Sequence, residues 1–381
     1  MLSGKKIAAN PELYFNPHIA AVPKYNAGLG LAAARAASGL EQIARLASNE
    51  NPYGCSPGVQ QVLSGSSVEP WRYSDPACQR LRMALGEQLG VDPERIVVGN
   101  GSEEMIAAAS RAFLSEGAEA LTVAPCFGLH EIEPLAVGAR VTKVPMTADF
   151  GFDVPALETA LARAPNVFFL PSPWNPVGAA LDHEQLARVI AATPESTLFV
   201  LDEAYCEFTS EAIPDGFEAL READRPYVVL RTFSKAFGLA GLRVGYAICA
   251  SVEIARMLSA AKTPFNVNAV AQAAAVAALD DQAWMQAAVA RICAERERVA
   301  GELRTLGLRV ARSEGNFLFF SVGRSSAEVA AELLKAGVVV KPWVEAQYQA
   351  FIRVSIGAPS ENDQFLAALA AVLRPAAAGA A

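Results

Sequence analysis

The sequence of 381 residues predicts an α/β protein with a mostly parallel central sheet, helices on both faces and a smaller α+β domain. From about Arg95 to Cys249, short apolar runs alternate with longer helical patterns, which is typical of a parallel sheet. The runs are apolar throughout, as expected for strands that helices cover on both faces. After about Asp281 the alternation stops and a long charged helical segment begins the smaller part.

The predicted elements of the large part follow one another at short intervals. The predicted strands are Ile96–Val98, Ala120–Ala124, Arg140–Val144, Val167–Leu170, Thr197–Leu201, Tyr227–Leu230 and Val244–Cys249. The predicted helices between them are Ser102–Ser115, Pro155–Arg163 and His183–Ala192. A chain of this length exceeds one domain of usual size, so we expect a second structural unit.

The two ends of the chain supply that second unit. An alanine-rich helix is predicted at Leu31–Leu46, and a long charged helix at Gln282–Thr305. The elements expected after it are Phe317–Val322, Ala327–Ala336, Val338–Lys341, Ile352–Ser355 and a final helix. We therefore place a large domain at residues 46–278, and an N-terminal arm with a small domain at residues 1–45 and 279–381.

Composition excludes several classes of function. The formal net charge of −8 offers no basic field for nucleic acid or for an anionic membrane. The cysteines and the three histidines are scattered without metal-ligand spacing, so no metal site is expected. The N-terminus lacks the apolar core of a signal peptide, and the stretch Ala269–Leu279 is too short for a membrane span. We expect a cytoplasmic protein.

The segment from Arg231 to Tyr246 carries the most informative chemistry. It follows an apolar strand and places a lysine among anion-binding side chains in a glycine-rich turn: Thr232, Ser234, Lys235 and Arg243. A lysine at the end of a buried strand suits carbonyl chemistry when burial or nearby cations lower its pKa. One guanidinium and two hydroxyls beside it suit a phosphate. A solvated lysine in a glycine-rich loop is the alternative for this segment alone.

With this segment, the chain resembles the fold-type I aminotransferases, specifically the histidinol-phosphate aminotransferase family. The resemblance runs from Leu46–Gly54 (LASNENPYG) to Arg353–Asn362 (RVSIGAPSEN) and so covers nearly the whole chain. It implies the fold of a fold-type I transferase that depends on pyridoxal 5′-phosphate (PLP), with Lys235 carrying PLP as a Schiff base. It also implies a homodimer with shared active sites.

The resemblance assigns five residues to the PLP ring and its surroundings. Asp202 follows a predicted strand, and a buried carboxylate at that sheet edge would keep the ring nitrogen protonated. By family analogy, Tyr205 and Asn175 hydrogen-bond the phenolic oxygen of the ring. Phe127 replaces a family aromatic that stacks on the ring, with core packing as the alternative. Tyr73 resembles the tyrosine that reaches the phosphate of the neighbouring subunit.

The turn Gly99–Glu104 (GNGSEE) is expected to hold the PLP phosphate at a helix N-terminus. Ser102 is the predicted N-cap, and the N–H groups of Gly101, Ser102 and Glu103 would face the phosphate. The carboxylate of Glu103 is unfavourable beside a dianion unless it turns away.

The substrate side is expected to grip an anion. Arg353 lies in the segment that carries the family's substrate arginine, although a structural salt bridge is the alternative. Lys341 stands where the family usually has arginine, which keeps the charge and loses the planar fork. Asn51 is a candidate at the entrance, and a turn capped by short polar side chains is an equal alternative. In the loop Pro171–Gly178, Ser172, Trp174 and Val177 depart from the family, which puts the fine positioning of substrate in question.

These observations predict a ping-pong aminotransferase that uses histidinol phosphate as donor and 2-oxoglutarate as acceptor. In this scheme Lys235 moves the proton as general base and acid. An aminotransferase for aromatic or other amino acids is the first alternative, because Lys341 changes the anion site. A PLP-dependent phosphothreonine decarboxylase and a non-catalytic PLP-binding protein are the further alternatives.

Overall fold

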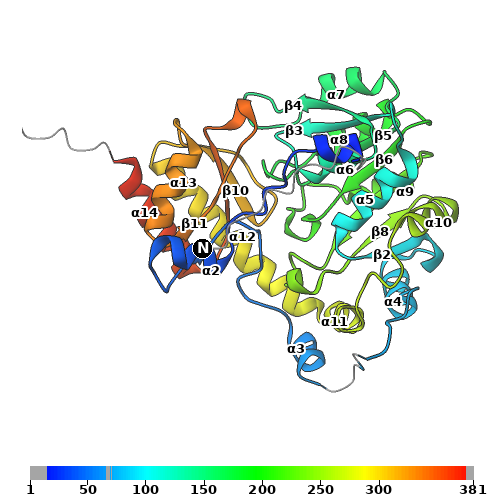
Figure 1. Cartoon of the computed structure of the whole chain (residues 1–381), viewed down its shortest axis with the longest axis horizontal. Coiled ribbons are helices and arrows are strands. Elements are labelled where there is room, and N and C mark those ends of the chain that lie inside the picture. The colour runs from blue at the N-terminus through cyan, green and yellow to red at the C-terminus, as the bar shows by residue number, and fades with distance from the viewer. Residues whose placement is uncertain (1–14, 66–68, 70, 375–381) are drawn as a thin grey trace, which may run out of the picture.

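The computed structural model describes residues 15–65, 69 and 71–374. Its largest element is a seven-stranded sheet in the order β2-β8-β7-β6-β5-β3-β4 (Figure 1). The strands are β2 (Ile96–Gly99), β3 (Glu119–Ala124), β4 (Arg140–Pro145), β5 (Val167–Pro171), β6 (Leu198–Asp202), β7 (Tyr227–Thr232) and β8 (Gly245–Cys249). All strands predicted for the large part are confirmed, with ends that move by two residues or fewer.

The sheet is mostly parallel, as predicted. Strands β3, β4, β5, β6 and β7 pair in parallel, whereas β8 runs antiparallel to β7 and β2 antiparallel to β8. The carboxyl ends of the parallel strands therefore meet at one edge. Ala124, Pro171, Asp202 and Thr232 are the last residues of their strands at this edge, where α/β proteins bind ligands.

Helices cover both faces of this sheet because successive strand residues point to opposite faces. Phe168 stacks on Phe199 with the ring centroids 5.1 Å apart, in the core that also contains Leu186 of α8 (His183–Ala192). Phe169, the next residue, packs instead with Ile106 and Leu258 of the two helices on the other face, α5 (Ser102–Phe113) and α10 (Val252–Ala261). Strands that are apolar throughout are thus buried on both sides. The other helices before α10 are α1 (Pro17–Ala21), α2 (Leu31–Ser38), α3 (Pro57–Ser64), α4 (Gln79–Leu89), α6 (Leu129–Ala136), α7 (Val154–Leu161) and α9 (Gly216–Arg221).

The smaller part contains a four-stranded sheet in the order β12-β13-β10-β9. All its pairs are antiparallel. Its strands are β9 (Arg309–Val310), β10 (Phe317–Ser321), β12 (Lys341–Pro342) and β13 (Phe351–Ser355). The helices after α10 are α11 (Ala269–Asp280), α12 (Gln282–Thr305), α13 (Ser326–Lys335) and α14 (Pro359–Leu373). Figure 1 shows α12 running from α11 of the large part into the smaller part, and its bounds are those predicted.

The helix predicted at Leu31–Leu46 is wrong in its second half. Helix α2 ends at Ser38, because Gly39 adopts a left-handed conformation with φ 72°. Its backbone N–H donates to the carbonyl oxygen of Arg35 and so caps the helix. The chain then forms β1 (Ala44–Arg45), which pairs in parallel with β11 (Val338–Val339). A glycine that ends a helix in this way was visible in the sequence, but the long-range strand pairing was not.

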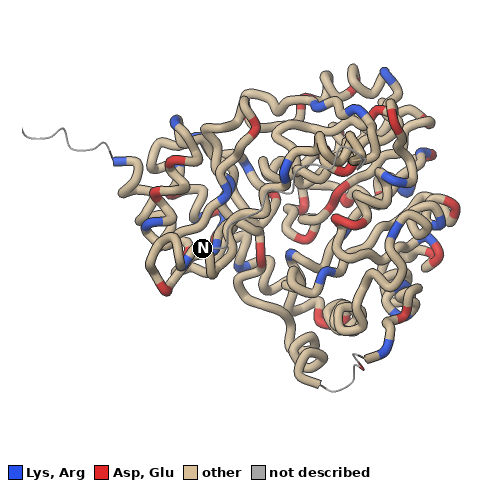
Figure 2. The backbone as a smooth tube through the Cα atoms, viewed as in Figure 1, with Lys and Arg blue, Asp and Glu red and all other residues tan. Residues whose placement is uncertain are grey.

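Charges of both signs are spread over the molecule. Figure 2 shows Lys and Arg interspersed with Asp and Glu in both parts of the fold, in keeping with the formal net charge of −8. Among the helices of the described ranges, none combines the length and the apolar character that a bilayer crossing needs.

Candidate active site

A large pocket lies where the carboxyl edge of the seven-stranded sheet meets the smaller sheet. The large sheet contributes Asp202 and Thr232, the loop after β7 contributes Lys235, and the smaller sheet contributes Lys341 and Arg353. Residues of the N-terminal arm, defined here as residues 15–30, complete the lining. The fold therefore brings together side chains that lie more than a hundred residues apart in the sequence.

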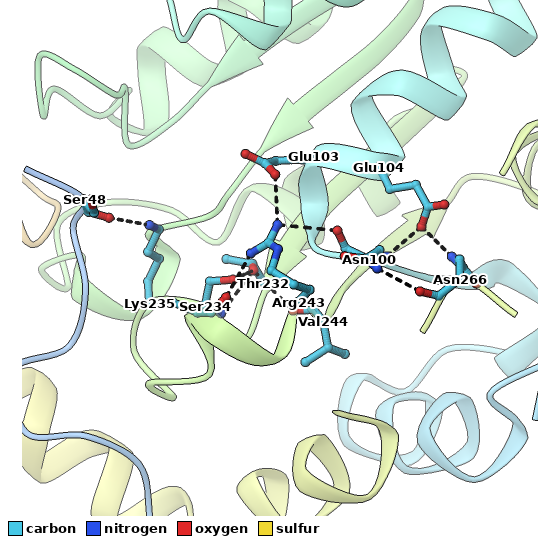
Figure 3. Close-up of polar contacts among 11 residues, drawn as sticks. Ser48, Asn100, Glu103, Glu104, Thr232, Ser234, Lys235, Arg243, Val244 and Asn266 are labelled. Atoms are coloured by element: carbon cyan, nitrogen blue, oxygen red, sulfur yellow. Dashed lines mark hydrogen bonds and ion pairs between the residues drawn. The ribbon is translucent and has the colours of Figure 1, made fainter. Parts of the chain in front are cut away.

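Lys235 follows β7 and points into this pocket. Its Nζ donates a hydrogen bond to the carbonyl oxygen of Ser48 at 3.1 Å (Figure 3). Burial, followed by the charge of Arg353, lowers the pKa of Lys235 to about 8. A substantial fraction of the amine is then neutral near physiological pH, which is the form that attacks carbonyl groups.

Asp202 is held by a histidine that no sequence pattern indicated. His130 Nε2 lies 3.1 Å from Asp202 Oδ2, and both side chains are buried. The imidazole is fixed between two aromatic rings, stacked on Phe169 and edge-on to Phe127. The amide of Ala204 donates to the other oxygen of the Asp202 carboxylate. No spacing signal links His130 to Asp202, so only the fold reveals this pair.

Tyr205 is oriented by Asn49, a second residue that sequence reasoning missed. Asn49 Nδ2 donates to the Tyr205 hydroxyl oxygen at 2.9 Å, which leaves the phenolic proton free to donate elsewhere. Burial raises the pKa of Tyr205 to about 12, so the hydroxyl stays protonated. The signal was the Asn-Glu-Asn-Pro run: its first asparagine, with φ 54°, is the one that turns toward the pocket.

The side of the pocket formed by the smaller sheet has two cations on neighbouring strands. Lys341 of β12 lies directly opposite Arg353 of β13, so both side chains project from the same face of the sheet. Arg353 donates from Nη1 to Asn175 Oδ1 at 2.7 Å and from Nη2 to the carbonyl of Ala47. Its buried Nε has no hydrogen-bond partner within the part of the chain described. Burial, followed by the charge of Arg353, lowers the pKa of Lys341 to about 8.

Lys341 is covered by the N-terminal arm. Its Nζ donates to the carbonyl of Asn26 and lies 5.9 Å from the ring centroid of Tyr25. Tyr25 itself lines the pocket, and burial raises its pKa. The arm thus closes the side of the pocket that the two strands leave open.

A third cation, Arg243, lies beside the N-terminus of α5. Its Nη2 donates to Glu103 Oε2 at 2.9 Å (Figure 3). A Cβ on Gly101 would come within 2.4 Å of the same guanidinium, and the φ of Gly101 is 78°. Glycine at position 101 therefore allows Arg243 to approach the first N–H groups of the helix, which is the arrangement that a phosphate needs.

The prediction that Ser102 is the N-cap of this helix is wrong. Gly101 occupies the N-cap position, Ser102 is the first helical residue, and no side-chain cap bond forms. Ser102 lines the pocket, so its hydroxyl remains available there. Thr232 and Ser234 line the same pocket, with the Thr232 hydroxyl donating to Ser234 Oγ at 3.0 Å.

Of three other predicted site residues, one lines the pocket and two lie outside its lining. Phe127 lines the pocket beside His130. Tyr73 lies outside the lining of its own pocket, is 87% exposed and packs on Phe265 with the centroids 4.8 Å apart. Asn51 is also outside the lining: its amide donates to the carbonyl of Ala236 and its Oδ1 caps the turn at Tyr53, which is the simpler of its two predicted roles.

The pocket fits PLP group by group. A small-residue turn with Arg243 and two hydroxyls suits the phosphate, a buried carboxylate suits the ring nitrogen, and Lys235 suits the aldehyde. The unpartnered Nε of Arg353 and the free Tyr205 proton provide donors for further anionic oxygens within the described part of the chain. A fold with these groups at the carboxyl edge of its sheet is that of a fold-type I, PLP-dependent enzyme.

Comparison with known proteins agrees with this class. The family described as Aminotransferase class I and II matches residues 41–369. The chain belongs to this family, and within it to the histidinol-phosphate aminotransferases, and it is a PLP-dependent transferase.

Individual relatives cover nearly the whole chain. Histidinol-phosphate aminotransferase 3 of Rhizobium meliloti is 41% identical, over 95% of this chain and 98% of the relative. Histidinol-phosphate aminotransferase 1 of Mesorhizobium japonicum is 42% identical, over 92% and 95%. A crystal structure of histidinol-phosphate aminotransferase from Sinorhizobium meliloti in complex with PLP matches with a TM-score of 0.86 and 29% identity, covering 94% of this chain and 97% of that chain.

Proposed function

We propose that this enzyme transfers the amino group of histidinol phosphate to 2-oxoglutarate by a ping-pong reaction through a Lys235 Schiff base. The observation that carries the proposal is the pair of cations on β12 and β13, Lys341 and Arg353, in the same pocket as Lys235. A phosphate in one half-reaction and a carboxylate in the other both require such a site. The names of the relatives support the choice of donor.

In this proposal, different residues of the pocket transfer the proton, bind the donor and hold the cofactor. When bound, PLP supplies an electron sink that acidifies the α-carbon of the donor. Lys235 Nζ, with its pKa of about 8, accepts the α-proton in its neutral form and returns a proton in its charged form. Arg353 and Lys341 hold the anionic group of the donor and so fix the α-carbon over Lys235. Asp202, held by His130, would pair with the ring nitrogen of bound PLP, and Tyr25 and Asn26 of the N-terminal arm would shield the bound donor at Lys341.

The assembly proposed is a homodimer in which Tyr73 reaches the phosphate of the neighbouring subunit. Tyr73 is 87% exposed, and its neighbour on the surface, Phe265, is 45% exposed. Large aromatic rings exposed side by side favour an interface with a second chain. The cytoplasmic location stays an expectation from the sequence.

The competing donor class is aromatic amino acids, which carry a carboxylate instead of a phosphate. Lys341 keeps the charge of the family arginine but not its two parallel hydrogen bonds, which bind phosphate and carboxylate alike, so this position does not select one donor class over the other.

Absorbance spectroscopy separates these proposals. The visible band of the PLP-loaded enzyme is followed while histidinol phosphate, phenylalanine, tyrosine or glutamate is added without an acceptor. Loss of the band with histidinol phosphate, and its return with 2-oxoglutarate, is the expected result. Loss with the aromatic amino acids alone would reject the proposed donor. Release of CO₂ without any need for an oxo acid would identify a decarboxylase.

A further inference from the structure

The loop that follows Lys341 places a tryptophan in the wall of the pocket. The amide of Trp343 donates to the carbonyl of Phe351 at 3.0 Å, which extends the pairing of β12 with β13. Residues two apart on a strand project from the same face, and Lys341 and Trp343 both line the pocket. The indole is half-buried and packs edge-on to Phe319 with the centroids 6.0 Å apart. One part of the indole therefore faces the pocket while another rests on the smaller core.

Glu345 fixes the orientation of this indole. Its Oε2 accepts the Trp343 Nε1–H at 2.6 Å and the backbone N–H of Cys126 at 2.9 Å. Its Oε1 accepts from Lys143 Nζ at 3.1 Å. Cys126 and Lys143 belong to the large part, whereas Glu345 and Trp343 belong to the smaller part. A single carboxylate thus connects the two parts and sets the indole at their junction.

A second hydrogen bond crosses this junction, and an ion pair within the large part supports Lys143. Tyr348, three residues after Glu345, donates from its hydroxyl to the carbonyl of Ala124 at 3.0 Å. Lys143 Nζ also pairs with Glu131 Oε1 at 2.9 Å, and Glu131 and Glu345 both line the pocket. The contacts to Ala124 and Cys126 hold the backbone that precedes Phe127, the residue expected to contact the PLP ring.

We propose that Trp343 forms the wall of a subsite for a planar ring in the side chain of the amino donor, and that Glu345 is the positioning residue that sets this wall. This inference rests on the proposed aminotransferase function. With the anionic group of the donor on Lys341 and Arg353, a side chain on the same α-carbon extends to the next pocket-facing position of the strand, which is Trp343. An indole face gains from offset or edge-on contact with another aromatic ring.

The charges near the wall define the class of ring. The cluster of Glu131, Glu345 and Lys143 carries a formal charge of −1. A neutral or protonated heteroaromatic ring suits this environment. The subsite therefore suits a ring such as imidazole.

The first test replaces the wall itself. In Trp343→Ala, we expect the KM of histidinol phosphate, and that of phenylalanine if wild type uses it, to rise roughly 10- to 100-fold, as for a lost apolar pocket contact. The KM of the oxo-acid acceptor and kcat should change less than about threefold. Trp343→Phe keeps an aromatic ring without the N–H, so its KM for the ring-bearing donor should lie between those of wild type and Trp343→Ala. If Trp343→Ala raises the KM of the ring-bearing donor and that of the acceptor equally, the ring subsite is rejected.

The second test separates positioning from stability. Glu345→Ala should raise the same KM values about as much as Trp343→Ala, and Glu345→Gln should recover most of the loss because its amide oxygen still accepts from Trp343. Gln347→Ala, an exposed residue of the same loop outside the pocket lining, is the matched control. Equal KM values in Glu345→Ala and wild type would overturn the positioning role. A fall in kcat alone for every substrate, without rescue by glutamine, would also overturn it.

Failure of this inference and failure of the proposed function give different results. If PLP-loaded wild-type enzyme shows no spectral change with any amino donor, the proposed function itself is wrong. If wild type responds normally and Trp343→Ala responds to histidinol phosphate with unchanged KM, only the ring subsite is wrong.

Discussion

The two sides of the active site are built in different ways. On the large-sheet side, functional groups at strand ends are held by buried neighbours, as His130 holds Asp202 and Asn49 holds Tyr205. On the smaller-sheet side, Arg353 is held by side-chain and backbone oxygens, but Lys341 depends on a carbonyl of the N-terminal arm. The arm residues at this point are exposed.

This difference suggests that the large-sheet side governs the reaction step and the smaller-sheet side governs which substrate binds. Buried pairs at strand ends fix their geometry because any displacement would leave polar groups unsatisfied. A cation covered by an exposed segment adapts more easily to a new donor. We therefore expect changes on the large-sheet side to affect kcat for every substrate, and changes on the smaller-sheet side to affect KM for particular substrates.

The largest effect is expected from Lys235→Ala. Removing the amine removes both the attachment of PLP and the group that moves the α-proton, so multiple turnover should fall by about 10³-fold or more with every donor. A steady-state assay measures this loss, with Lys335→Ala, an exposed lysine on α13, as the control. If Lys235→Ala retained multiple turnover, Lys235 would not be the catalytic lysine, and the large-sheet side would not govern kcat as proposed.

A smaller effect on kcat is expected from His130→Asn. The variant loses the imidazole that holds the Asp202 carboxylate and the ring stack on Phe169. Loss of a hydrogen bond to a charged group corresponds to about 10- to 100-fold in kcat. The loss should be the same for donor and acceptor half-reactions, as single-turnover kinetics can measure. A change confined to the KM of one donor would place His130 on the recognition side.

The pH dependence of donor binding tests the smaller-sheet side. The pKa of Lys341 is lowered to about 8, so the ammonium is charged below that pH and becomes neutral above it. The KM of histidinol phosphate should therefore rise about tenfold as the pH increases from about 7 to 9, as a charge-assisted contact is lost. Lys341→Arg keeps its charge and should flatten this rise. Because Lys235 is present in both proteins, a pH profile that is identical in the two would exclude Lys341 as its cause.

The smallest effect is expected at the phosphate turn. Glu103 forms a partly exposed ion pair with Arg243 and, in the proposed PLP site, would compete with the phosphate for this guanidinium. Glu103→Gln should therefore tighten PLP binding about two- to fivefold, within the range of exposed ion pairs. Titration of the apo-protein with PLP, followed by absorbance, measures this directly, with Glu116→Gln, an exposed acid, as the control. Weaker PLP binding in Glu103→Gln would show that Glu103 holds Arg243 in place for the phosphate and does not compete with it.

Local sequence patterns determined much of this protein. The apolar runs were sufficient to locate the seven strands of the large sheet, because burial on both faces leaves little freedom of composition. The resemblance to a known family selected Lys235, Asp202 and Arg353, which the fold does bring to one pocket. The end of α2 was misjudged because pairing of β1 with β11 depends on a segment nearly three hundred residues away.

Tertiary structure alone decided which polar groups meet. His130 and Asp202 are 72 residues apart, Asn49 and Tyr205 are 156 apart, and Glu345 lies 219 residues from Cys126. None of these pairs has a sequence period, because each forms only when strand ends and loops of different elements converge at one edge of the sheet. The sequence by itself therefore determined the strands of the large sheet and the reactive lysine. The partners that tune and orient the site follow from packing, since a buried polar group is stable only where the fold supplies its hydrogen bond.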